Sequence, residues 1–130
     1  MGNAALRPDI GDKPVILVID DEPEAREALE LILQDWGGEI IAGAHERDIA
    51  AAIAGRWNEI RYIIADFDLG PEPDGVTLAQ RFARRAPRAR VLVMSGLLSA
   101  DATRAAARAG YSFVPKPATA KTILTWLESA

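Results

Sequence analysis

The feature that most constrains the fold of this chain is a regular alternation of short apolar runs with amphipathic segments. The apolar runs are rich in β-branched and aliphatic residues and have the length of strands that are buried on both faces. They comprise residues 14–20, 39–43, 61–65, 90–94 and 111–115. The intervening segments carry apolar side chains at helical spacing. We expect helices at residues 22–36, 46–54, 76–86, 101–109 and 120–128.

Strands that alternate with helices predict a parallel sheet with helices on both of its faces, because each crossover connection is right-handed and buries its apolar stripe against the sheet. The expected fold is therefore a single doubly wound (βα)5 domain of the α/β class, with a five-stranded parallel sheet. A chain of 130 residues has the usual size of one domain. We expect a flexible leader at residues 1–13 and the folded domain at residues 14–130.

Composition excludes several classes of protein. With 49% hydrophobic residues, 26% charged residues and a net charge of −4, the chain has the balance of a globular protein and not of a nucleic-acid binder. The arginines within residues 81–90 are interpreted as a solvated helix face. The absence of cysteine excludes disulfides and thiolate metal sites and suits a reducing cytoplasm. No apolar run is long enough to span a bilayer, so we expect a cytoplasmic protein without a membrane partner.

Polar side chains stand where the predicted strands end. The first strand leads into Asp20 and Asp21, the third into Asp66, the fourth into Ser95 and the fifth into Lys116. In open parallel sheets the ligand site lies beyond the carboxyl ends of the strands. We therefore expect these residues to meet in one crevice.

Clustered carboxylates repel one another, and a hard divalent cation with oxygen ligands relieves that repulsion. Mg²⁺ suits such a site because it takes one or two carboxylates and retains several waters. Lys116 adds a positive point charge. With oxygen charge neutralised in this way, Asp66 could act as a nucleophile toward phosphorus and form an acyl phosphate.

The segments "VIDDE", "ADFDLGPEPDG", "VMSG" and "FVPKP", in this order and at this spacing, resemble the signature of receiver domains from two-component response regulators. The resemblance extends from Pro14 to Leu127 and implies a flavodoxin-like fold and a phosphoprotein of signal transduction. The "SG" and "FVPKP" segments are most similar to those of receivers attached to hybrid sensor kinases, which act in phosphorelays.

By this resemblance each site residue acquires a role. Asp66 is the phosphoacceptor, Asp20 and Asp21 hold Mg²⁺ together with Asp66, and Asp68 supplies its backbone carbonyl to the metal. Ser95 is the switch hydroxyl, Phe113 the switch aromatic and Lys116 the lysine that contacts phosphate, placed by a cis peptide bond before Pro117. These assignments are expectations from the family pattern. The chain departs from that pattern in the loop from Asp66 to Gly75, where Gly70 and Pro71 occupy unusual positions and Asp68 is an uncommon acid.

The same resemblance implies a switch that catalyses only its own phosphorylation and slow dephosphorylation, not a turnover enzyme. The expected donor is a histidine kinase or a histidine phosphotransfer protein. The expected output surface, for an effector or a second copy of the chain, is the face of the fourth helix, fifth strand and fifth helix, with Leu97 and Leu98 as apolar contacts.

Simpler interpretations exist for each residue alone. Asp21 or Glu22 could cap a helix, Lys116 could be a surface lysine, Ser95 a turn residue and Phe113 a core residue. Their joint placement at successive strand ends favours the functional interpretation.

A second function class is a phosphatase of the haloacid-dehalogenase type, because "DFDLG" resembles its Asp-x-Asp motif, with Asp66 as nucleophile and Asp68 as general acid. Against it, the acidic pair Asp20 and Asp21 precedes the lysine, and the candidate nucleophile follows the third strand and not the first.

Overall fold

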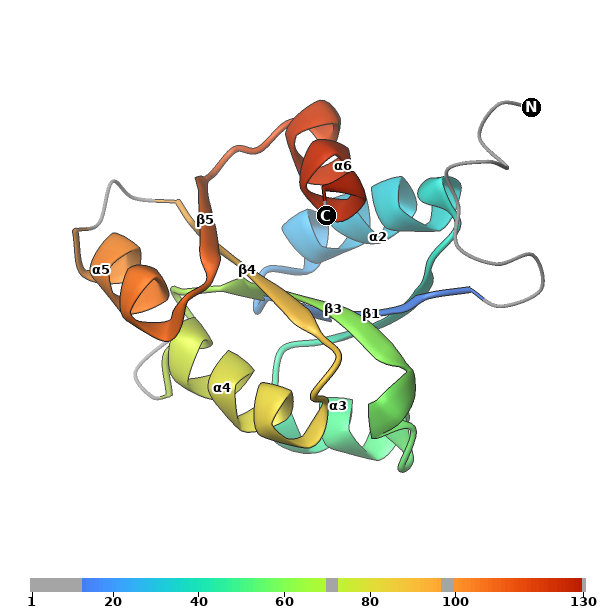
Figure 1. Cartoon of the computed structure of the whole chain (residues 1–130). Coiled ribbons are helices and arrows are strands. Elements are labelled where there is room, and N and C mark those ends of the chain that lie inside the picture. The colour runs from blue at the N-terminus through green and yellow to red at the C-terminus, as the bar shows by residue number, and fades with distance from the viewer. Residues whose placement is uncertain (1–12, 70–72, 97–99, 130) are drawn as a thin grey trace.

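The computed structural model describes residues 13–69, 73–96 and 100–129, and Figure 1 shows how its strands and helices are arranged. The strands are β1 (Val15–Ile19), β2 (Glu39–Gly43), β3 (Ile60–Asp66), β4 (Arg90–Ser95) and β5 (Ser112–Pro115). The helices are α2 (Pro23–Trp36), α3 (Glu46–Ile53), α4 (Gly75–Arg85), α5 (Ala100–Ala109) and α6 (Ala120–Glu128). The expected alternation is confirmed, with element bounds within one or two residues of the predicted ones.

All five strands form one parallel sheet in the order β2-β1-β3-β4-β5. The chain moves outward from β1 to β2 and then crosses back to β3 on the other side of β1. The carboxyl ends of β1 and β3 therefore flank the point where the winding reverses, which is where doubly wound folds place their ligand sites. The predicted doubly wound, flavodoxin-like α/β fold is confirmed.

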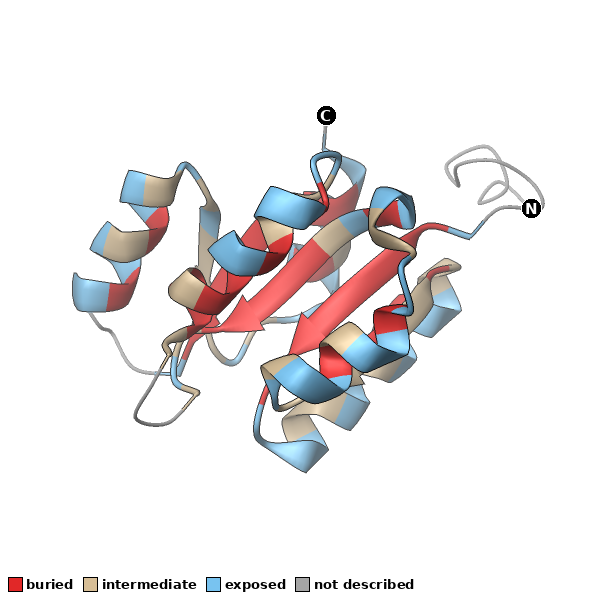
Figure 2. Ribbon diagram, turned by 90° about the horizontal axis from the view of Figure 1, so that it is seen from below, coloured by how far each residue is buried: buried red, intermediate tan, exposed pale blue. Residues whose placement is uncertain are grey.

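Two apolar layers hold the helices on the sheet. Helices α2 and α6 cover one face, where Leu29 and Leu33 of α2 meet Ile123 and Leu127 of α6 over the central strands. Helices α3, α4 and α5 cover the other face, through residues such as Ile49 and Phe82. Figure 2 shows the consequence: the central strands are buried along their length, while the helices are buried only on the side that faces the sheet.

Local signals in the sequence set the ends of several helices. Pro23 occupies the first turn of α2, where its missing N–H costs nothing, and Gly37 ends the helix in the left-handed region at φ 115°. Asp74 caps α4, since its side chain accepts a hydrogen bond from the Thr77 N–H at 2.8 Å. Thr119 caps α6 in the same way, through the Thr122 N–H.

Two features of the strands and loops differ from the expectation. Strand β3 continues to Asp66, which pairs with Met94 of β4, so the sheet itself fixes the backbone of this carboxylate. A short 3-10 turn, η1 (Trp57–Glu59), precedes β3 and was not predicted, because a single turn has no hydrophobic period. Among the described residues, no helix is both long enough and apolar enough to cross a membrane.

Candidate functional site

The carboxyl edge of the sheet brings the predicted side chains together. Asp20 directly follows β1, Asp66 and Ser95 are the last residues of β3 and β4, and Lys116 directly follows β5. Asp20 is 4% exposed, Asp66 6% and Ser95 0%, which is unusual for groups of this polarity. Buried polar groups require partners: Asp20 and Asp66 pair with Lys116, and Ser95 bonds to Asp68.

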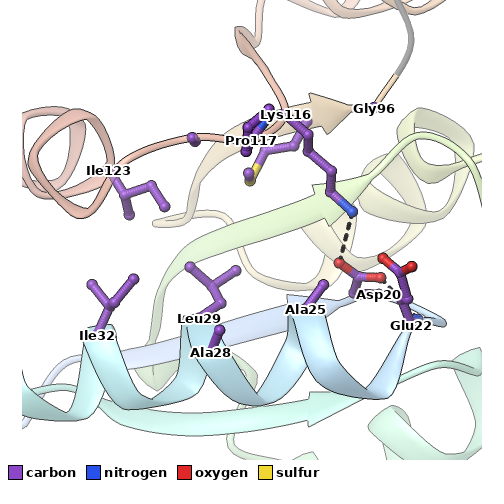
Figure 3. A pocket seen from close by; sticks show the side chains of 12 residues that line it. Asp20, Glu22, Ala25, Ala28, Leu29, Ile32, Gly96, Lys116, Pro117 and Ile123 are labelled. Carbon is purple, nitrogen blue, oxygen red and sulfur yellow. Dashed lines mark hydrogen bonds and ion pairs between the residues drawn. The ribbon is translucent and has the colours of Figure 1, made fainter.

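Lys116 joins the two buried carboxylates. Its Nζ donates to Asp20 Oδ2 at 3.0 Å and lies 3.3 Å from Asp66 Oδ2. The Lys116–Pro117 peptide bond is cis, as expected. Figure 3 shows the lysine side chain extending from the end of β5 toward Asp20, so the interpretation of Lys116 as a surface lysine is wrong.

The protonation of the site follows from burial and from this ion pair. Burial raises the pKa of Asp66 to about 6. The Asp68 N–H and the Lys116 ammonium favour the charged form of Asp66 and lower its pKa, whereas the negative charge of Asp20 raises it. Burial alone would lower the pKa of Lys116, but its hydrogen bonds and attraction to Asp20 and Asp66 outweigh this effect and raise it. At pH 7, Asp66 is therefore mainly a carboxylate and Lys116 an ammonium.

Three carboxylates form a group that could hold a cation. Oxygen atoms of Asp20, Asp21 and Asp66 all lie within 4.8 Å of one another. Asp21 is exposed, whereas Asp20 and Asp66 are buried, so the group opens to solvent on one side. Hard carboxylate oxygens with an open side match the needs of Mg²⁺, which retains waters. The donor set thus fits the predicted metal.

The backbone around Asp20 is fixed by contacts that sequence reasoning missed. Its Oδ1 accepts the Glu22 N–H at 2.9 Å, and its carbonyl accepts a hydrogen bond from Arg26 at 2.8 Å. Glu22 is the N-terminal flanking residue of α2 but makes no side-chain cap, so the alternative that the acids near β1 only cap this helix is not supported. No sequence signal pointed to the bond from Arg26, because it depends on how α2 approaches β1.

Asp68 connects the Asp66 carboxylate to the Ser95 hydroxyl. Its backbone N–H donates to Asp66 Oδ1 at 3.1 Å, and its side-chain Oδ2 accepts the Ser95 hydroxyl at 2.8 Å. The sequence indicated Ser95 and Asp68 separately but not this bond.

Gly75 allows α4 to start directly against the acceptor strand. A Cβ at this position would lie 2.6 Å from the Asp66 carbonyl carbon and 2.9 Å from Phe67 Cα. The Gly75 N–H donates to the Phe67 carbonyl at 3.1 Å. The glycine in "PDG" is therefore required by the close approach of two backbones.

The remaining predicted residues are only partly placed. Phe113 is half-buried and packs against the core beneath α4 and α5. Leu97 and Leu98, as well as Gly70 and Pro71, lie outside the described residues. The role of the Asp68 carbonyl as a metal ligand stays a prediction.

An apolar groove of about 420 Å³ adjoins the carboxylates. Figure 3 shows it between α2 and the start of α6, with Ala28, Leu29 and Ile32 on one side and Pro117 and Ile123 on the other. Its residues Glu22, Gly96 and Lys116 also line the crevice that contains Asp66. The groove and the polar site are therefore continuous.

Comparison with known proteins agrees with this geometry. Residues 16–128 match the response regulator receiver domain family, and the chain belongs to this family. A CheY-like receiver domain protein from Methanospirillum hungatei JF-1 has a similar structure, with 22% identity, a TM-score of 0.75, and coverage of 89% of this chain and 91% of the other. The chemotaxis protein CheY4 of Vibrio cholerae is also similar, with 21% identity, a TM-score of 0.74, and coverage of 89% and 97%.

A third similar structure is more closely related in sequence. It is a response regulator protein from Burkholderia pseudomallei, determined with a phosphorylated aspartic acid, a calcium ion and citrate. It has 31% identity and a TM-score of 0.73 over 88% of this chain and 65% of the other. Family membership makes the chain a receiver domain of two-component signal transduction, a phosphorylation-dependent switch, and does not favour the phosphatase alternative.

Proposed function

We propose that this receiver accepts a phosphoryl group on Asp66 from the phosphohistidine of a histidine kinase or a histidine phosphotransfer protein. The observation that carries the proposal is the placement of Asp66, a buried carboxylate at the carboxyl end of β3 that lies 3.3 Å from Lys116 and within a group of three carboxylates. The phosphorylated aspartic acid of the Burkholderia pseudomallei protein supports it.

The residues of the chain have distinct tasks in this reaction. Asp20, Asp21 and Asp66 would hold Mg²⁺, with the Asp68 carbonyl as a further ligand, and the bound cation would neutralise oxygen charge on the phosphoryl group. An oxygen of Asp66 attacks phosphorus while the bond from phosphorus to the donor histidine nitrogen breaks. Lys116, already directed at Asp66, balances the charge of the incoming phosphoryl oxygens.

The proposed outcome is a change of state and not the turnover of a substrate. The phosphoryl group adds nearly two negative charges and three acceptor oxygens. Ser95, at the end of the neighbouring strand, is the hydroxyl that would move toward them, and Phe113 would follow. The altered surface would comprise α5, β5 and α6, where an effector or a second copy would bind.

The test is phosphorylation by a small donor. With acetyl phosphate and Mg²⁺, intact-mass spectrometry should show a gain of one phosphoryl group, and a chelator should abolish this gain. Asp66→Asn should remain folded and gain nothing. If Asp66→Asn gained the same mass as the parent, Asp66 would not be the acceptor and the proposed function would be wrong.

The protein donor should use the groove beside the site. Lys116 lines the same groove as the apolar residues of α2 and α6, so a donor seated over Lys116 would also contact that apolar wall. Ala28→Arg places a long charged side chain in that groove, and we expect it to slow transfer from a purified phosphorylated kinase at least tenfold. Transfer from acetyl phosphate, which needs no protein contact, should change less than twofold.

The matched control is Ala51→Arg, at an exposed position of α3 on the opposite face of the sheet. It should leave both reactions as they are in the parent. Equal rates of kinase transfer to Ala28→Arg and Ala51→Arg would show that the donor does not contact the groove.

A further inference from the structure

The hydrogen bond from Ser95 to Asp68 uses the only proton that the Ser95 side chain can donate. A serine hydroxyl carries a single proton to donate. In the structure that proton points to Asp68 Oδ2, with an oxygen–oxygen distance of 2.8 Å. The Ser95 side chain is fully buried, so water cannot readily replace this partner.

The acceptor in this bond is a carboxylate oxygen. An ionised carboxylate only accepts, and hydrogen bonds to an ionised acceptor are about twice as strong as those between neutral groups. The Asp68 loop is also fixed on its other side, because its backbone N–H donates to Asp66 Oδ1. Asp68 therefore contacts both the acceptor carboxylate and the hydroxyl that would answer its phosphorylation.

We propose that the Asp68 carboxylate is a competing acceptor that holds the Ser95 hydroxyl in the unphosphorylated receiver and thereby reduces the fraction of phosphorylated molecules that switch. This inference rests on the proposed function of Asp66 and Ser95. A phosphoryl oxygen on Asp66 and the Asp68 carboxylate cannot both receive the single proton of Ser95. The free energy of the bond to Asp68 is thus lost whenever Ser95 turns to the phosphoryl group.

Asp68 can release Ser95 because its side chain is accessible to solvent. Ser95 is buried, but Asp68 is exposed, so water can solvate its carboxylate once the bond breaks. The contact is therefore a reversible restraint and not a permanent structural bond. Its strength depends on the charge of Asp68, which a single isosteric substitution removes.

The experiment titrates beryllium fluoride, an analogue of the phosphoryl group, into the protein at saturating Mg²⁺. The half-saturating concentration is measured by NMR from the amide signals of Ser112, Phe113, Val114 and Lys116. Because Asn offers only a neutral acceptor, Asp68→Asn should lower this concentration about fivefold to tenfold. Asp68→Ala, which offers no acceptor, should lower it at least as far.

Two further variants separate the bond from the general loss of charge. Glu22→Gln removes one negative charge from the same crevice and should lower the half-saturating concentration no more than twofold. In a Ser95→Ala background, Asp68→Asn should have only the small effect of Glu22→Gln. A larger effect that persists without the Ser95 hydroxyl would overturn the proposal, as would equal effects of Asp68→Asn and Glu22→Gln.

The outcomes also distinguish a failure of the proposed function from a failure of the proposed competition for Ser95. If the parent and Asp66→Asn responded to beryllium fluoride alike, the proposed function would fail. If the parent responded but Asp66→Asn did not, and Asp68→Asn behaved like the parent, the proposed function would stand and the competition for Ser95 would be refuted.

Discussion

At the scale of single residues, the site balances two buried carboxylates against one ammonium. Lys116 contacts both Asp20 and Asp66, yet burial still raises the pKa of Asp66 to about 6. The folded chain without metal therefore tolerates the charged form of Asp66 less well than the unfolded chain does. The proposed role of Asp66 agrees with this property, because a bound cation would relieve the cost of its buried charge.

The raised pKa of Asp66 predicts that Asp66→Asn stabilises the metal-free protein at pH 7. A raised pKa means that the folded state binds the proton more tightly, so this group lowers stability as the pH rises from about 4 to about 6 and keeps it lower above that range. A pKa raised to about 6 corresponds to at most about 3 kcal/mol, and we expect a gain of roughly 1 to 2 kcal/mol.

Urea unfolding in the presence of a chelator measures the effect. The gap in free energy of unfolding between Asp66→Asn and the parent should be larger at pH 7 than at pH 4.5, where the folded parent is protonated at Asp66. A gap that is unchanged or larger at pH 4.5 would show that burial does not disfavour the charge of Asp66.

At the scale of elements, the site depends on how closely α4 approaches the end of β3. Gly75 begins α4 and lies against the backbone of Asp66 and Phe67, while Asp74 caps the helix just before it. The same contact that packs the helix thus holds the loop that carries Asp68. The packing of α4 and the position of the Asp68 loop therefore cannot be changed independently.

We predict that Gly75→Ala destabilises the fold and impairs the site together. The added methyl group would overlap the Asp66 and Phe67 backbone, which cannot move without shifting β3, and overpacking of this kind costs typically about 1 to 3 kcal/mol. Phosphorylation by acetyl phosphate should slow at least tenfold, because the Asp66 carboxylate would leave its position beside Lys116.

Gly96→Ala is the matched control in the same crevice. The nearest atom to a Cβ at this position is Lys116 Cδ at 3.9 Å, an ordinary contact, so stability should change by less than about 0.5 kcal/mol. Equal losses of stability in the two variants would contradict the steric explanation for Gly75.

At the scale of the whole molecule, the topology explains why residues distant in the sequence could be assigned to one site. Parallel strands end at the same edge, so the alternation alone placed Asp20, Asp66, Ser95 and Lys116 together before any contact was known. These residues stand at the end of a strand or directly after it, where the sheet fixes the backbone.

The features that the sequence could not predict depend on side-chain direction in loops and at helix starts. Asp68 follows the last residue of β3 by two positions, and nothing in its spacing shows that its carboxylate turns to Ser95. The bond from Arg26 to the Asp20 carbonyl depends on the exact approach of α2 to β1. Such contacts follow from three-dimensional packing and leave no periodic signal in the sequence.

The differential interaction free energy of the whole molecule determines how completely it can switch. Moving a two-state equilibrium from 1:99 to 99:1 requires about 5.5 kcal/mol of differential interaction. One or two charge-assisted hydrogen bonds to the phosphoryl group supply roughly 1.5 to 3 kcal/mol each. If Asp68 competes for Ser95 as proposed, the bond between them subtracts from that supply, and a binding partner would contribute to completing the switch.

The most direct test of the central claim is the chemical identification of the phosphorylated residue. Borohydride reduces an aspartyl phosphate to homoserine, so the protein is phosphorylated with acetyl phosphate and Mg²⁺, reduced, digested and sequenced by mass spectrometry. The account predicts homoserine at position 66 in the treated parent and at no position in Asp66→Asn. Homoserine at position 20, 21 or 68, or a phosphorylated parent without any homoserine, would contradict it.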